Sequence, residues 1–272
     1  MRKGLLFIEE LIAPMKVSVI TAVRNAAQAI RVTLKSVEAQ DYADIEHIVV
    51  DGASTDGTPE AVKAIGKRVS VFVSEPDSGV YQAFNKGLRR ATGDVVAYIN
   101  AGDEYVSPSV ISSVVGAFRD RPVDAVFGDA ALVDAEQRDR TLRVYSSARF
   151  LPSRLAYGFM PAHPTLFLRK RVYDEVGEYD ESYRIAGDFE FCVRAFCRRS
   201  LSYHYLPDTL VRMADGGLSN RGWRSKWLIT REMHRACVEN SVSTSLFKLL
   251  LRFPVKALEV RFGTSIRTQP GS

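Results

Sequence analysis

Short apolar runs alternate with amphipathic stretches through the first half of this 272-residue chain. The runs are rich in Val and Ile, and the continuous one at residues 95–99 is typical of a strand covered on both faces. The predicted strands are residues 16–21, 46–50, 69–73, 95–99 and 123–127. The predicted helices are residues 30–39, one that starts at Thr58 and Pro59, 80–90 and 108–118. This alternation predicts an α/β fold with a mostly parallel sheet.

The second half of the chain is more polar and less regular. Weak strand signals lie at 131–133 and 141–145, and a further strand is expected at 165–168. Helices are expected at residues 172–176 and from Gly187 onward.

The chain divides into three parts. Residues 1–14 are interpreted as an N-terminal extension, because acidic residues interrupt the apolar stretch that a signal peptide would need. Residues 15–220 are predicted to form one α/β domain in two halves, 15–128 and 129–220. Residues 221–272 form a basic, amphipathic C-terminal tail.

Acidic loops follow two of the predicted strands. Asp51 ends the second strand, and Asp103 and Glu104 follow the fourth. Because the carboxyl ends of parallel strands lie at one edge of a sheet, Asp51 and Asp103 are expected to face the same crevice. Two acids beyond a buried strand suit a cation or a polar ligand, although a solvated turn has the same composition. No G-x-G-x-x-G follows the first strand and no P-loop motif occurs.

Charge and cysteine content narrow the partners and the compartment. The net charge of +5 suits anionic partners such as nucleotides, acidic lipids or nucleic acid. The three cysteines include no C-x-x-C pair, which favours a reducing compartment over a disulfide framework. No run of about 18 or more apolar residues occurs, so no transmembrane helix is predicted.

Five short motifs, taken in order, resemble those of family 2 glycosyltransferases. They are V-S-V-I-T at 17–21, D-G-A-S-T-D-G-T at 51–58, D-S-G-V-Y-Q-A-F-N-K-G at 77–87, N-A-G-D at 100–103 and G-D-F-E-F at 187–191. The resemblance covers roughly residues 15 to 220 and implies a GT-A fold, a Rossmann-like, mostly parallel sheet flanked by helices. It also implies a nucleotide-sugar-binding half at 15–128 and an acceptor half at 129–220. The third motif is similar to bacterial enzymes that build surface polysaccharides or glycolipids.

The resemblance implies a role for each matching residue. The backbone at Thr21 and Ala22 and the carboxylate of Asp51 would hold the nucleotide base, usually uracil. Asp77, Asn85 and Lys86 would lie along the ribose, diphosphate or donor sugar. The implied nucleotide-sugar contacts are Thr21, Ala22, Asn25, Asp51, Asp77, Asn85, Lys86, Asn100 and Gly102.

Two further carboxylates have implied chemical roles. Asp103 would coordinate Mg²⁺ or Mn²⁺, which neutralises charge on the departing diphosphate. Asp188 would be the general base that deprotonates the acceptor hydroxyl, and a single base with in-line attack implies inversion at the anomeric carbon. The family usually has an acid shortly before the metal-binding Asp, where this chain has Asn100, Ala101 and Gly102. Metal binding is therefore expected to depend on the donor diphosphate.

Several residues have more than one interpretation. His163 faces the acceptor, helps the metal site or is a structural histidine. Glu190 ranks second to Asp188 as the base. Gly216 and Gly217 have the composition of a mobile lid.

The tail also keeps two readings. Basic residues mixed with bulky apolar ones suit a helix on an anionic membrane surface, and a packed helix with a solvated basic face fits equally. The resemblance favours the membrane, where a lipid-linked glycan or glycolipid acceptor would be presented to a cytoplasmic enzyme at the inner face.

Two other functions fit parts of the sequence. A nucleotidyltransferase on a similar scaffold would need a basic, glycine-rich loop after the first strand, which TAVRNAAQ does not provide. A non-catalytic module that binds anionic lipid or nucleic acid would explain the charge. The basic residues concentrate in the tail, however, and no nucleic-acid motif is visible, so no nucleic acid is expected.

Overall fold

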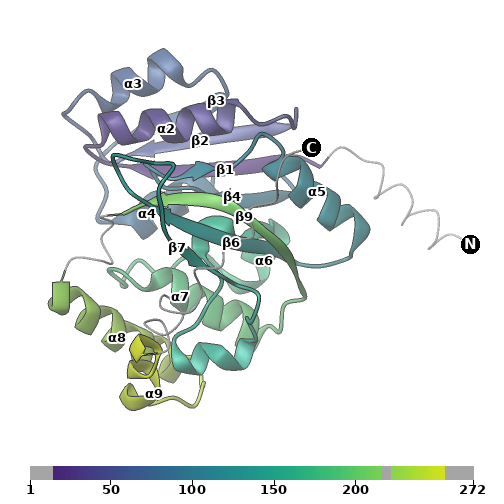
Figure 1. Cartoon of the computed structure of the whole chain (residues 1–272), viewed down its shortest axis with the longest axis vertical. Helices are drawn as coiled ribbons and strands as arrows, with labels where there is room; N and C mark the ends of the chain where they lie inside the picture. The colour runs from purple at the N-terminus through teal and green to yellow at the C-terminus, as the bar shows by residue number, and fades with distance from the viewer. Residues whose placement is uncertain (1–14, 216–221, 255–272) are drawn as a thin grey trace, which may run out of the picture.

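A computed structural model describes residues 15–215 and 222–254 of the chain (Figure 1). Its centre is a nine-stranded mixed sheet in the order β3-β2-β1-β4-β8-β6-β9-β5, and β7 pairs with β6 outside this path. The strands are β1 Val17–Val23, β2 Ile45–Asp51, β3 Val69–Ser74, β4 Val95–Tyr98, β5 Glu104–Tyr105, β6 Ala125–Val133, β7 Thr141–Tyr145, β8 Phe167–Arg169 and β9 Tyr203–Ala214. The helices are α2 Ala27–Glu38, α3 Thr58–Ile65, α4 Val80–Leu88, α5 Val110–Asp120, α6 Arg171–Val176, α7 Gly187–Cys192, α8 Gly222–Glu239 and α9 Leu246–Leu250. The predicted α/β fold with a mostly parallel sheet flanked by helices is confirmed.

The first half is the parallel part of the sheet. Strand β1 pairs in parallel with β2 and β4, and β2 pairs in parallel with β3. Each of these strands was predicted to within about two residues, because each is a β-prone apolar run bounded by turn residues. The carboxyl ends of β1, β2 and β4 therefore lie at one edge of the sheet.

The second half adds strands that run in both directions. Strand β8 pairs antiparallel with β4 and β6, β6 pairs in parallel with β9, and β5 pairs antiparallel with β9. The two strands expected at 123–127 and 131–133 are one continuous strand, β6. The strand expected at 165–168 begins only at Phe167, because His163–Thr165 form a 3₁₀ turn.

Strand β9 and the two-residue β5 were missed by the sequence analysis. The register of β9 against β6 shifts between Phe127 and Asp129, where Tyr205 and Thr209 are their partners. Pro207 lies inside this shift. Proline has no backbone N–H to donate, and it is tolerated here because the regular hydrogen-bond ladder is already interrupted. A proline and an aspartate in the middle of the segment hid a 12-residue strand.

The sheet is packed on both faces, as the alternation of its side chains requires. Ile20, Val96 and Tyr98 belong to a core shared with α4, α6, α7 and α8. Val19 and Ala97, which point the other way, belong to a core shared with α5. Helices α2 and α3 cover the remaining strands on the side away from α7 and α8 (Figure 1).

Two polar pairs are buried between β1 and β2. The Nε2 atom of His47 lies 3.0 Å from the hydroxyl of Thr21, and desolvation lowers the His47 pKa to about 3. His47 is therefore neutral and structural. Nearer the amino ends of the strands, Glu46 accepts a hydrogen bond from Ser18 at 2.6 Å.

Candidate active site

The loops after β1 and β2 are joined by hydrogen bonds. The N–H of Asn25 donates to the Ser54 hydroxyl at 2.7 Å, and the Asn25 side-chain oxygen accepts from the N–H of Thr55 at 2.9 Å. Asn25 and Ala53 both have a positive φ, 47° and 55°. Left-handed backbone is unfavourable for alanine, so the surrounding hydrogen bonds hold a strained loop at this edge.

Asp51, at the end of β2, binds residues of the same loop. Its carboxylate is fully buried and accepts hydrogen bonds from the N–H and the hydroxyl of Ser54 and from the hydroxyl of Ser74, the last at 2.6 Å. The neighbouring acid, Asp56, accepts from the N–H groups of Ala27 and Thr58 at 3.0 and 3.1 Å. Asp56 therefore accepts from the first amides of two helices, α2 and α3.

Asp77 lies directly against Gly52. A Cβ atom on Gly52 would come within 2.4 Å of an Asp77 carboxylate oxygen and 3.2 Å of the Cδ of Arg24. Glycine is required here because two loops approach each other closely. The Asp77 carboxylate has no hydrogen bond or ion pair with another residue of 15–215 or 222–254, so it is free to meet a ligand.

Asn85 and Lys86 use their polar groups within the protein. The Asn85 amide donates to the carbonyl of Tyr179 at 2.9 Å and to Glu181 at 3.0 Å, and it accepts from the N–H of Tyr179. The Lys86 ammonium contacts the Pro76 carbonyl at 2.7 Å and also pairs with Glu75. Both residues therefore hold the loops around Asp77 and around Tyr179, and their contact with a donor stays a prediction.

The turn after β4 is held by one threonine of α2. The Thr33 hydroxyl lies 3.1 Å from the carbonyl of Asn100 and 2.7 Å from that of Asp103, and it accepts from the N–H of Gly102 at 3.0 Å. Gly102 has a φ of 100°, which favours glycine at this position. The turn thus has one defined shape that brings the Asp103 side chain inward.

Asp103 is a buried carboxylate, 8% exposed. Burial raises its pKa to about 7, although hydrogen bonds from the Asn100 side chain and the Ala214 N–H and the charge of Arg138 oppose the rise. Glu104, beside it, is paired with Arg138 at 3.0 Å. Burial therefore opposes the ionisation of Asp103, and the carboxylate of Glu104 is already paired with the guanidinium of Arg138.

The donor set fits a hard divalent cation only in part. Among residues 15–215 and 222–254, no group of three or more His, Cys, Asp or Glu side chains could hold a metal ion. Mg²⁺ commonly takes one or two carboxylates and completes its shell with water and substrate phosphates. Asp103 fits that arrangement as a single protein ligand, and a cation beside it would offset the cost of burying its charge.

Asp188 lies in the first turn of α7, on the opposite side of the parallel half from α2. Its Oδ1 accepts from the N–H of Phe189 at 2.8 Å and lies 3.4 Å from the hydroxyl of Tyr81. The side chain is only partly buried, so it is accessible to a substrate. Its geometry suits an acceptor of protons.

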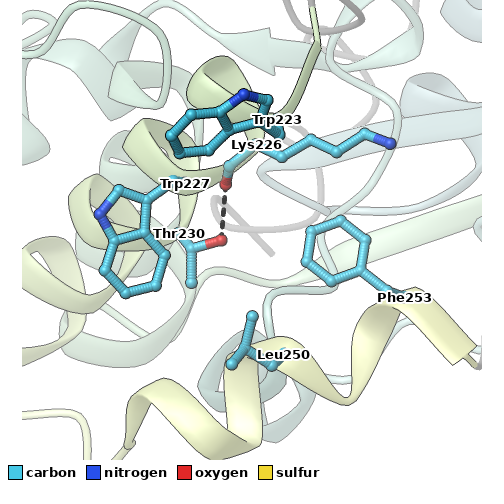
Figure 2. A pocket seen from close by; sticks show the side chains of 6 residues that line it. All are labelled: Trp223, Lys226, Trp227, Thr230, Leu250 and Phe253. Carbon is cyan, nitrogen blue, oxygen red and sulfur yellow. Dashed lines mark hydrogen bonds between the residues drawn. The ribbon is translucent and has the colours of Figure 1, made fainter.

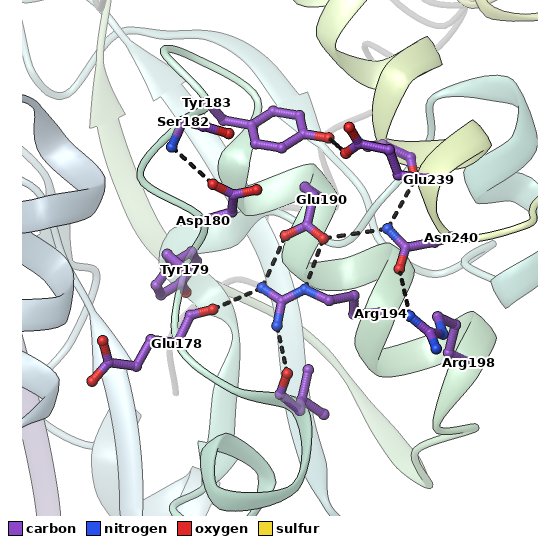
Figure 3. Close-up of polar contacts among 12 residues, drawn as sticks. Glu178, Tyr179, Asp180, Ser182, Tyr183, Glu190, Arg194, Arg198, Glu239 and Asn240 are labelled. Atoms are coloured by element: carbon purple, nitrogen blue, oxygen red, sulfur yellow. Dashed lines mark hydrogen bonds and ion pairs between the residues drawn. The ribbon is translucent and has the colours of Figure 1, made fainter.

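Glu190, two residues further on, has a different environment (Figure 3). Its carboxylate forms a two-pronged ion pair with Arg194, at 2.7 and 2.9 Å, and lies 3.3 Å from the Asn240 amide. Glu190 is 4% exposed. We therefore assign it to the structure of the α7–α8 layer, where Arg194 also binds the Glu178 carbonyl.

His163 lies in an aromatic cluster with Phe84, Tyr98 and Tyr179. Its Nε2 is 2.9 Å from the Tyr179 hydroxyl, and its ring stacks on Phe84 at a centroid distance of 5.5 Å. Burial lowers the His163 pKa, and the charge of Asp188 partly offsets this. A neutral, hydrogen-bonded ring fits the structural reading of His163.

Some residues that hold this edge together carry no signal in the sequence, and some predicted site residues are not covered by the structure. Thr33 and Arg138 hold the turn around Asp103, yet both lie in segments without a recognisable motif. Gly216 and Gly217, expected to form a lid, lie outside the described residues.

Helices α8 and α9 carry an open apolar pocket of about 480 Å³ (Figure 2). Its lining residues are Trp223, Lys226, Trp227, Thr230, Leu250 and Phe253. Trp223 is 75% exposed and Trp227 46% exposed, which is unusual for tryptophan. In the part of the chain that the structure describes, no helix is long and apolar enough to cross a bilayer.

The basic residues of the tail are less exposed than their sequence suggested. Arg252 is 3% exposed and donates to the Thr230 hydroxyl at 2.8 Å, so it packs α9 on α8. Lys248 lies 5.7 Å from the centre of the Tyr157 ring. The exposed basic side chains of α8 are Arg224, Lys226, Arg231 and Arg235. Four further basic residues of the tail, Arg221, Lys256, Arg261 and Arg267, lie outside the described residues.

Comparison of the sequence with known families gives a match over most of the domain. The sequence model of "Glycosyl transferase family 2" matches residues 18–177. A curated relative, the "PGL/p-HBAD biosynthesis glycosyltransferase" of Mycobacterium tuberculosis (strain ATCC 25618 / H37Rv), is 28% identical over 214 residues. The match covers 76% of this chain and 80% of the relative.

Solved structures share the fold at low sequence identity. Residues 1–349 of TarS from S. aureus, in complex with UDP-GlcNAc, match with a TM-score of 0.64 at 18% identity, over 92% of this chain and 74% of that one. The mannosyltransferase PcManGT from Pyrobaculum calidifontis, in complex with GDP-Man and Mn²⁺, matches with a TM-score of 0.61 at 19% identity. That match covers 97% of this chain and 89% of the other. These likenesses confirm the GT-A fold.

Proposed function

The chain belongs to glycosyl transferase family 2, and from that premise we propose the reaction it performs. The enzyme transfers a hexosyl group from a UDP-sugar to a hydroxyl group of a lipid-linked glycan or glycolipid, with inversion at the anomeric carbon. The observation that carries this proposal is Asp103, a buried carboxylate with a raised pKa at the carboxyl edge of the parallel strands. Such a group is costly unless a cation or a ligand meets it.

The donor lies along the loops after β1, β2, β3 and β4. Asp51 and the backbone at Thr21 and Ala22 form the base end, and Asp77 faces the middle of the donor beside Gly52. Asn25, Asn100 and Gly102 shape the loops on either side. UDP-GlcNAc in TarS and GDP-Man in PcManGT support a nucleoside diphosphate sugar as the donor class.

Asp188 moves the proton in the transfer step. Its carboxylate accepts the proton of the acceptor hydroxyl as that oxygen attacks the anomeric carbon, and the bond from this carbon to the diphosphate oxygen breaks. The nucleoside diphosphate leaves from the opposite face, which inverts the configuration. Asp103 would hold Mg²⁺ or Mn²⁺, which when bound supplies positive charge to the leaving diphosphate.

The α8–α9 pocket supports an acceptor that is presented at a membrane. Exposed Trp223 and Trp227 sit beside the basic side chains of Arg224, Lys226 and Arg231, a combination suited to the surface of an anionic bilayer. The mycobacterial relative is named a PGL/p-HBAD biosynthesis glycosyltransferase, so it too belongs to a biosynthetic route, and for this chain we propose a lipid-linked acceptor. We place the enzyme in the cytoplasm, in peripheral contact with the inner face of the membrane.

Titration calorimetry tests the donor site. UDP, UDP-GlcNAc and GDP-Man are titrated into the wild type and into Asp103→Ala, each with and without Mn²⁺. We expect one nucleotide to bind in a Mn²⁺-dependent way and the variant to lose that dependence. Unchanged Mn²⁺-dependent binding in Asp103→Ala would exclude Asp103 as the ligand, and no binding of any nucleotide would contradict the proposed donor class.

A further inference from the structure

Helix α8 holds the segment just before Asp188 through one buried carboxylate. Glu232 is 9% exposed, and its Oε1 accepts a hydrogen bond from the N–H of Arg184 at 3.0 Å. Its Oε2 accepts from the N–H of Ile185 at 2.9 Å and from that of Ala186 at 2.8 Å. Three consecutive backbone amides thus converge on a side chain that comes from another helix.

One of these hydrogen bonds lies at the start of α7, because Ala186 is the N-cap residue and Arg184 and Ile185 precede the helix. Ala186, the residue at the start of α7, has no side chain that can cap the helix. The first amides of a helix need acceptors, and negative charge is favoured at this end by the helix dipole. An ionised carboxylate offers only acceptors, so Glu232 suits three converging N–H donors.

A second helix holds the same segment from the other side. The Tyr81 hydroxyl of α4 donates to the Ile185 carbonyl at 2.5 Å and lies 3.4 Å from the Asp188 carboxylate. A Cβ atom on Gly187 would lie 2.8 Å from the Tyr81 ring, so the backbone packs directly on this ring. The segment is therefore fixed between α4 and α8, and Asp188 is the first side chain beyond it that can reach a substrate.

Two further residues on the same face of α8 contact the chain just before residues 184–186. Glu232, Arg235 and Glu239 are spaced three and four residues apart, which places them side by side. Arg235 donates to the Ser182 hydroxyl at 2.8 Å. Glu239 accepts from the Tyr183 hydroxyl at 2.8 Å (Figure 3). The contact of Arg235 is exposed and that of Glu239 is partly buried, whereas Glu232, whose partners lie nearest Asp188 in the sequence, is 9% exposed.

We propose that Glu232 is a positioning residue for glycosyl transfer, because it fixes residues 184–186 and so holds the Asp188 carboxylate where it meets the acceptor hydroxyl. The inference rests on the proposed function, in which Asp188 is the general base. Small displacements of a reacting group can lower a rate by about 100-fold. Loss of Glu232 is therefore expected to slow turnover while the donor, bound at the far loops, is held as before.

The test compares Glu232→Gln with the wild type. Glutamine keeps the shape, but its NH₂ group directs hydrogens at amides that need an acceptor. Turnover is followed as UDP released from UDP-GlcNAc, with water and octyl glycosides as acceptor probes, per folded enzyme. We expect kcat to fall at least tenfold with the KM for UDP-GlcNAc unchanged within twofold, and Glu232→Asp to recover part of the loss. Glu239→Gln, on the same face of α8, is the matched control and should keep kcat within twofold.

The double variant Asp188→Asn/Glu232→Gln shows whether Glu232 acts through Asp188. We expect the kcat of the double variant to be no lower than that of Asp188→Asn alone. Once the base has been removed, losing the contact that positions it should not slow the reaction further. Wild-type kcat in Glu232→Gln, a parallel rise in donor KM, or a further loss in the double variant would each overturn the inference. If Asp188→Asn itself turns over normally, the proposed function fails first, and this outcome separates the two failures.

Discussion

The loops at the carboxyl edge of the sheet and the junction of α4, α7 and α8 reach a fixed geometry in different ways. At the edge, Asp51 binds Ser54, three residues away, and neighbouring loops of consecutive strands interlock. At the junction, Tyr81 binds the carbonyl of Ile185 across 104 residues. Contacts within one loop, which a short motif can encode, contribute to the edge, although Thr33 also binds the Asp103 carbonyl across 70 residues. The junction is held between separate helices.

The junction also separates two carboxylates that the sequence places side by side. Asp188 keeps an accessible carboxylate between Phe189 and Tyr81, and Glu190 is enclosed by Arg194 and Asn240. Helical geometry turns positions two residues apart to different faces. One acid is thus left for chemistry and the other stabilises the layer that positions it.

The largest expected effect comes from Asp188→Asn, which removes the base and keeps the shape. We expect kcat to fall by a factor of about 10² to 10⁴, the usual contribution of general base catalysis. Nucleotide binding by calorimetry and the unfolding midpoint should stay near the wild type, since the edge loops are built independently. A kcat within threefold of the wild type would show that another group takes the proton.

Glu190→Gln should lower the free energy of unfolding and leave kcat almost unchanged. The change leaves the buried guanidinium of Arg194 without its carboxylate, which costs about 3 kcal/mol of unfolding free energy. Urea unfolding of the variant measures this loss, and kcat of the folded fraction should stay within a few-fold of the wild type. A stable variant with 100-fold lower kcat would instead make Glu190 the base.

The same contrast explains which parts of the fold and of the site could be predicted from the sequence. The parallel strands and the position of Asp103 followed from apolar runs and from loops of Asp and Gly, all of which are local signals. Strand β9 was missed because Pro207 and Asp208 interrupt its pattern, and they are tolerated only where the register shifts. Glu232 could not be identified, because its three amide partners lie 46 to 48 residues away and any helix face can carry a glutamate.

Glu46→Gln tests whether the edge depends on the opposite ends of its strands. Burial opposes the ionisation of Glu46, but hydrogen bonds from Ser18, Thr92 and Lys16 lower its pKa to about 2. Because the folded pKa lies below the unfolded value, this carboxylate stabilises the fold above about pH 4.5, and the gain is lost as the pH falls towards 2. We expect the variant to be about 2 kcal/mol less stable at pH 7, with the difference shrinking over that window.

Thermal unfolding of both proteins between pH 7 and pH 3 measures this difference. Glu60→Gln, on the exposed face of α3, is the control and should show almost no pH-dependent difference. Nucleotide binding at pH 7 should not change in Glu46→Gln, since the loops that meet the donor lie at the other end of the strands. A constant difference between the proteins across the pH range would contradict the assigned hydrogen bonds.

The smallest effect is expected at the edge itself, from Thr33→Val. The substitution keeps the volume but removes the hydroxyl that binds the Asp103 carbonyl and the Gly102 N–H, so the turn loses its defined shape. We expect about tenfold weaker Mn²⁺-dependent nucleotide binding, near 1.4 kcal/mol, with little change in the α7–α8 junction. Ser36→Ala removes a buried hydroxyl one turn along α2 that contacts only the Thr33 carbonyl, and it should bind as the wild type does. Wild-type affinity in Thr33→Val would mean that the Thr33 hydroxyl is not needed to shape this turn, and that the turn takes its final shape when the donor binds.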